Sequence, residues 1–121
     1  MRQAIDSSGA WARGTFAVVV LVSLAVLFAP QSDVPSAPPG VDKLVHLALF
    51  AALSVTGRWA GIGRRVLVVG LVVYAAVSEV VQGVTPLART ASVADWLADV
   101  VGVLLGLGLW ALLTRPRRPA S

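Results

Sequence analysis

Nine polar residues between positions 42 and 99 could carry chemistry in a chain that is otherwise mostly apolar. They are Asp42, Lys43, His46, Glu79, Gln82, Arg89, Ser92, Asp95 and Asp99. Carboxylates beside a histidine can transfer protons or bind a polar ligand, and lysine or arginine can hold a phosphate or a carboxylate. The chain has one histidine and no cysteine, which excludes a multi-histidine zinc site and any thiolate site within one chain.

The spacing of six of these residues places them on helix faces, because side chains three or four positions apart are neighbours on a helix. The pairs are Asp42 with His46, Glu79 with Gln82, and Asp95 with Asp99. Asp99 would lie about 9 Å from the start of its helix at about 1.5 Å per residue. An acid at that depth in a membrane normally faces the bundle interior or a wet cavity, and it has a partner.

The elements that must position these residues are apolar helices. The chain is 57% hydrophobic and 13% charged, whereas a soluble domain carries about 25% charged residues. Four runs approach the roughly 20 residues that cross a bilayer. We predict spans at about 14–30, 41–60, 66–84 and 93–113 in one membrane domain, residues 14–113, between a short N-terminus, 1–13, and a basic tail, 114–121. A cleaved signal peptide is the alternative for the first run, but no A-x-A site follows it.

The basic residues predict the orientation of these spans. Most of the ten cations fall on one side of the predicted bilayer, namely Arg2, Arg13, Arg58, Arg64, Arg65, Arg115, Arg117 and Arg118. Short connectors make neighbouring helices antiparallel, and the excess of Lys and Arg marks the cytoplasmic side. We therefore predict an all-α, four-transmembrane-helix antiparallel bundle with both termini cytoplasmic. The net charge of +4 is explained by these flanks and does not indicate nucleic-acid binding.

This orientation places all nine polar residues toward the outer side. Arg89, the only arginine expected there, is a natural partner for Glu79, whose position near a helix C-terminus is otherwise unfavourable for an acid. Ser92 and Asp95 also fit a capping box. Gly102 and Gly106 continue the face of Asp95 as a G-x-x-x-G pattern, which in a membrane indicates close packing of a second helix.

Four segments together resemble the VanZ-like family, small bacterial membrane proteins named after an accessory teicoplanin-resistance protein. The segments are "DKLVH" from Asp42, "SEVVQ" from Ser78, the stretch with Arg89 and Ser92, and "DWLADVVGVLLG" from Asp95. The resemblance covers Val41 to about Leu107 and implies a multi-pass protein of the bacterial cytoplasmic membrane. The family usually has Asn where this chain has Asp99, and a protonated Asp there could serve as the donor instead.

Three functions fit the pattern. A binding module would recognise a cell-wall lipid intermediate, a phospholipid headgroup or a glycopeptide such as teicoplanin, through all nine polar residues. An enzyme acting on a lipid-linked phosphate would use His46 as general acid or base, with Asp42 or Glu79 orienting it. A structural or regulatory subunit would use the same residues as an internal salt-bridge network. A metal held by His46 and carboxylates is a variant of the first two, but we expect neither metal nor cofactor, because Lys43 and Arg89 already offset part of the acid.

Overall fold

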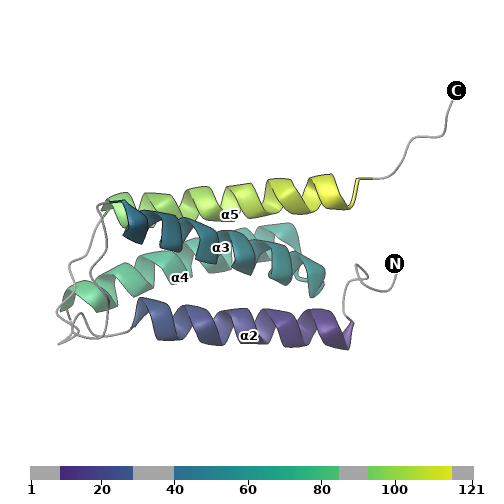
Figure 1. Ribbon diagram of the computed structural model, residues 1–121, viewed down its shortest axis with the longest axis horizontal. Coiled ribbons are helices and arrows are strands. Elements are labelled where there is room, and N and C mark those ends of the chain that lie inside the picture. Colours follow the sequence, from purple (N-terminus) through teal and green to yellow (C-terminus); the bar gives the residue numbers. More distant parts are fainter. Residues whose placement is uncertain (1–8, 29–39, 85–92, 116–121) are drawn as a thin grey trace, which may run out of the picture.

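The computed structural model describes residues 9–28, 40–84 and 93–115, and four helices account for almost all of them. The helices are α2 (Ala10–Leu27), α3 (Val41–Trp59), α4 (Arg64–Val84) and α5 (Val93–Leu113). Consecutive helices run in opposite directions, so the beginning of α2 and the end of α5 share one end of the bundle (Figure 1). The prediction of an all-α chain with four helices is confirmed.

Three of the helices are long and apolar enough to cross a membrane, namely α2, α4 and α5, with 18, 21 and 21 residues. Their outward faces carry large apolar side chains such as Leu21, Val69 and Leu104, each more than half exposed. An apolar surface of this extent suits contact with lipid. Helix α3 is not among the three, because its 19 residues include Asp42, Lys43 and Arg58. That α3 also spans the bilayer stays a prediction.

Helices α3, α4 and α5 each bury one stripe of residues three or four positions apart, as expected for helices that pack along their length. In α3 the buried stripe runs from His46 through Phe50 to Gly57. In α4 it begins with Leu67 and ends with Gln82, whereas in α5 it begins with an acid, Asp95. Because the helices alternate in direction, the polar ends of these three stripes coincide at one end of the bundle.

Helices α3 and α5 form the closest pair, and two glycines of α5 account for this. A Cβ on Gly102 would overlap the carbonyl oxygen of Leu47, and one on Gly106 would lie 2.5 Å from the carbonyl oxygen of Ala51. The Ser54 hydroxyl donates a hydrogen bond across the same contact to the Val103 carbonyl oxygen, at 3.0 Å. Small residues that let two backbones approach are the usual device of membrane helix pairs.

The turn between α3 and α4 has the geometry of a Schellman cap. Gly61 has a φ of 93°, in the left-handed region, and its N–H donates to the Arg58 carbonyl at 3.0 Å while the Ile62 N–H donates to the Gly57 carbonyl at 3.1 Å. These two bonds satisfy carbonyls that the helix end would leave without partners. The turn reverses the chain in a few residues, so that α4 runs back toward the end at which α3 begins.

Candidate functional site

Seven of the nine predicted site residues lie together at one end of the bundle, and we call them the polar cluster. It consists of Asp42, Lys43 and His46 from α3, Glu79 and Gln82 from α4, and Asp95 and Asp99 from α5. Exposure falls with depth, from 54% for the Asp42 side chain at the rim to 0% for that of Asp99. Arg89 and Ser92 lie outside the described residues.

The deepest part of the polar cluster is a hydrogen-bonded pair between α3 and α5. His46 Nδ1 lies 2.8 Å from Asp99 Oδ1, and both side chains are almost fully buried. Sequence reasoning placed both residues in the site but gave His46 Asp42 or Glu79 as its orienting acid. The direct pair requires the two helices to be very close, and the only sequence signal for that closeness was the glycine pattern on α5.

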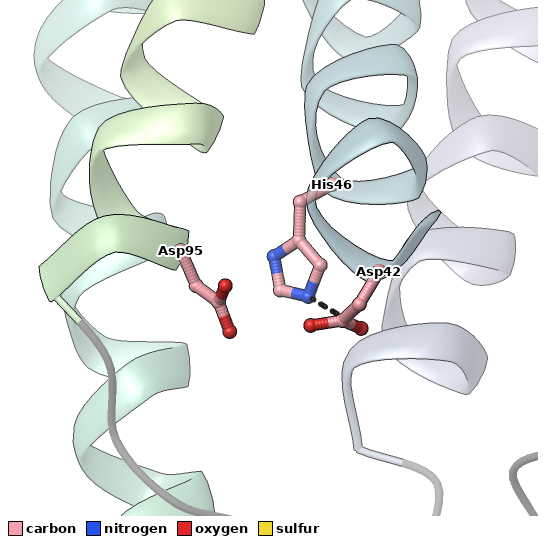
Figure 2. A group of neighbouring side chains, drawn as sticks. All are labelled: Asp42, His46 and Asp95. Atoms are coloured by element: carbon pink, nitrogen blue, oxygen red, sulfur yellow. Dashed lines mark ion pairs between the residues drawn. The ribbon is translucent and has the colours of Figure 1, made fainter. Parts of the chain in front are cut away.

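The rim of the polar cluster brings two further acids to the same histidine. Asp42, His46 and Asp95 converge from α3 and α5 (Figure 2), with His46 Nε2 3.8 Å from Asp42 Oδ1. Lys43 Nζ lies 3.2 Å from Asp95 Oδ1, so the lysine bridges the same two helices on the more exposed side. Acids therefore outnumber cations in the polar cluster, where four carboxylates face one lysine and one histidine.

The two α4 residues differ in what they contact. The Gln82 amide donates a hydrogen bond to the Leu27 carbonyl oxygen in the last turn of α2. The last carbonyls of a helix accept no hydrogen bond from within that helix. Glu79 is buried, and one of its carboxylate oxygens lies within 4.8 Å of ligand atoms of His46 and Asp99. Gln82 thus ties α4 to α2, while Glu79 belongs with the buried pair.

Two sets of three side chains have the composition and proximity of a metal site, although the sequence favoured none. One set is Asp42, His46 and Asp95 at the rim, and the other is His46, Glu79 and Asp99 in the interior. In each set, one ligand atom per residue lies within 4.8 Å of the others. His46 belongs to both sets, and its two ring nitrogens face different neighbours.

Sequence reasoning missed two buried hydroxyl contacts that hold the helices around the polar cluster. Ser54 bonds to the backbone of α5, and its position eight residues after His46 on the same helix face was the available signal. Ser23 of α2 lies 2.8 Å from the hydroxyl of Tyr74 in α4. Neither contact reaches the carboxylates, so both belong to the frame that supports the site.

A comparison with known families agrees with the presence of membrane helices. The VanZ/LLP1 family model matches residues 6–114, which include all four helices. No curated protein and no solved structure was found to match the chain. A match over nearly the whole chain, with three helices able to cross a membrane, shows that this chain is a membrane protein of the VanZ/LLP1 family.

Proposed function

We propose that the protein binds a polar ligand of the bacterial envelope through the polar cluster. The observation that supports this most directly is the burial of Asp99, Glu79 and His46 where α3, α4 and α5 meet. Ionisable groups inside a membrane domain are costly, and they normally mark a ligand or ion site. The half-exposed Asp42 and Lys43 at the rim leave this end of the bundle open to solvent or headgroups.

The charge balance favours a ligand that carries a cationic amine. Asp95 and Asp42 would contact the amine, while Lys43 and Arg89 would contact a neighbouring phosphate or carboxylate. A cell-wall lipid intermediate, a phospholipid headgroup and a glycopeptide such as teicoplanin are the candidate ligands. A role in glycopeptide resistance would follow from binding of the last of these or of its cell-wall target.

The orientation belongs to the same proposal. The described arginines lie away from the polar cluster, at the start of α2, at the α3–α4 turn and after α5, and they are Arg13, Arg58, Arg64, Arg65 and Arg115. Cationic flanks of this kind favour the cytoplasmic side. All four helices would then span the bacterial cytoplasmic membrane, with both termini inside and the polar cluster facing outward.

The test is a binding screen with the full chain in nanodiscs, against cell-wall lipid intermediates, phospholipids and teicoplanin. Asp95→Asn and Arg89→Ala should each weaken binding of the true ligand by tenfold or more, since charge-assisted contacts to it are lost. Thr114→Ala, which removes an exposed hydroxyl at the opposite end, should leave binding unchanged. Absence of binding to all three classes, or equal affinity in wild type and Asp95→Asn, would reject the proposal.

A second candidate is an enzyme, which the bond between His46 and Asp99 favours. A carboxylate that holds one imidazole nitrogen orients the other for proton transfer, and Nε2 faces the rim of the polar cluster. Such an enzyme would act on a lipid-linked phosphate held by Lys43 and Arg89. Headgroup analysis of lipids from cells that carry wild type or His46→Ala decides this, because identical headgroup profiles would exclude turnover.

A further inference from the structure

We propose that the rim of the polar cluster is a divalent transition-metal site formed by His46 Nε2, Asp42 and Asp95, with Asp99 supporting the histidine from behind. The proposal concerns binding of the ion itself and does not depend on the envelope ligand proposed above. It rests on the state of the two imidazole nitrogens, on the separation of the candidate ligand atoms, and on access from the rim.

Nε2 is the imidazole nitrogen of His46 that is available to a metal ion. Nδ1 lies 2.8 Å from Asp99 Oδ1. When Asp99 is ionised, its carboxylate can only accept, and Nδ1–H donates this bond. A neutral imidazole then has its lone pair on Nε2. Metal-binding histidines typically donate their second ring N–H to a carboxylate, which fixes the tautomer and strengthens the ligand. Asp99 lies at the second ring nitrogen of His46 in the same way.

The surroundings of His46 Nε2 favour a cation. This atom is buried, and among the described residues no hydrogen-bond partner lies at it. A buried polar atom without a partner is unfavourable. Its neighbour Asp42 Oδ1 lies 3.8 Å away, which is too long for a hydrogen bond. A lone pair directed toward carboxylate oxygens is an arrangement that a cation between them would stabilise.

The distances between the candidate ligand atoms are close to those that a single metal ion can bridge. Metal bonds of about 2.0–2.2 Å to nitrogen and oxygen allow two ligands of one ion to lie up to about 4.2 Å apart. The 3.8 Å between Nε2 and Asp42 Oδ1 falls inside that limit, and the three ligand atoms all lie within 4.8 Å of one another. Rotation of the half-exposed Asp42 side chain can close the remaining gap.

The interior set of His46, Glu79 and Asp99 is a weaker candidate. Its Nδ1 to Oδ1 distance of 2.8 Å is that of a hydrogen bond, and it is shorter than the roughly 3.4 Å between two ligands on a tetrahedral ion with bonds of about 2.1 Å. All three residues are buried, so an ion would have no exposed ligand at its entrance. We therefore assign Asp99 and Glu79 to the surroundings of the ion.

The donor set indicates which ion to use as a probe. One imidazole with carboxylates suits Zn²⁺ or Mn²⁺, whereas Mg²⁺ and Ca²⁺ prefer ligands that are all oxygen. Three protein ligands leave coordination positions open toward the exposed rim. Lys43 is the competing cation, since its Nζ lies 3.2 Å from Asp95 Oδ1. The ion must displace Lys43 from that carboxylate.

The experiment uses the purified, chelator-treated full chain in nanodiscs, without any envelope ligand. The chain is titrated with ZnCl2, and calorimetry measures the heat of binding. We expect one saturable ion per chain. Asp42→Asn at the exposed rim should weaken binding by about tenfold or more, and Asp99→Asn should also weaken it, by about tenfold. Lys43→Gln should strengthen binding at least threefold, because a competing cation is removed.

Absence of saturable binding in folded wild type, or equal affinity in wild type and Asp42→Asn, would reject the rim site. Glu79→Gln should leave the affinity for Zn²⁺ within twofold, and a loss as large as that of Asp42→Asn would instead assign the ion to the interior set. Helix content measured by circular dichroism confirms for each variant that the bundle is folded. Because no headgroup or antibiotic is present, failure here leaves the proposed envelope ligand untouched.

Discussion

The buried face of the bundle has two parts of opposite character. At the end where α3 and α5 begin, the buried residues include His46, Glu79, Gln82, Asp95 and Asp99, whereas farther along they are mainly Phe50, Leu53, Leu67, Leu71, Ala75 and Val103. The apolar part obtains little from leaving lipid, because lipid is equally apolar, so its stability depends on packing. The polar part must find a partner for every group or remain strained.

Function and stability depend on different parts of this buried face. The apolar part contains the close contact of Gly106 with the α3 backbone, and the rings of Phe50 and Tyr74 pack in a tilted pair with centroids 5.8 Å apart. The polar part contains an excess of carboxylates that packing alone does not require. Changes in the polar part should therefore alter ligand or ion binding as well as stability, and changes in the apolar part should alter stability alone.

The largest effect is expected from breaking the buried pair. Asp99→Leu removes the partner of His46 and leaves a polar ring in an apolar site, which should lower the free energy of unfolding by about 3–5 kcal/mol. Unfolding in mixed detergent, followed by circular dichroism, measures it.

The control for this variant is a double-mutant cycle. Apolar residues at both positions remove the polar groups together, so His46→Leu combined with Asp99→Leu should recover most of the loss. If the double variant is less stable than wild type by the sum of the two single effects, the two side chains do not act as a pair.

A smaller effect is expected where α3 and α5 touch. Gly102→Ala places a Cβ against the Leu47 carbonyl, and separating the helices should lower the free energy of unfolding by about 1–3 kcal/mol. Gly108→Ala is the matched control, because nothing lies within 4 Å of its added Cβ. Helix propensity alone should make that control neutral or stabilising by up to about 1 kcal/mol. Equal effects of the two substitutions would contradict close packing at Gly102.

The smallest effect is expected from a hydroxyl in the apolar part. Ser54→Ala removes the 3.0 Å bond to the Val103 carbonyl and should lower stability by about 0.5–1.5 kcal/mol. Thr56→Ser is a mild control, since the hydroxyl there bonds within its own helix, to the Ala52 carbonyl at 2.7 Å, and is retained. Zinc affinity should not change in either variant. A Zn²⁺ affinity that falls with Ser54→Ala would show that the two parts are coupled.

Much of the fold could be predicted because helices in membranes are marked by local patterns. The predicted starts of α3 and α5, at positions 41 and 93, agree with the structure. Helix α2 begins at Ala10 and ends at Leu27, so helical backbone precedes the predicted span at about 14–30. Trp11 and Arg13 lie in this first part of the helix, and such side chains can reach the interface from it.

The polar cluster could be predicted as a set of residues but not as a set of contacts. Spacing alone placed Asp42 with His46, and Asp95 with Asp99, on single helix faces. It could not show that His46 contacts Asp99 directly or that Gln82 donates a hydrogen bond to the end of α2. Those contacts depend on how far apart the helices lie and on how each is rotated about its axis.

Composition and residue spacing were enough to predict the membrane class, the four helices, the family resemblance and the end of the bundle at which polar groups gather. These follow from composition and from periodicity within each helix, which are local properties. Only the packed helices show that Asp99 contacts His46 Nδ1, that Nε2 faces Asp42, and that Lys43 pairs with Asp95. The physical reason is the close approach of α3 and α5 at Gly102 and Gly106, which brings side chains 53 residues apart in the chain within hydrogen-bond distance.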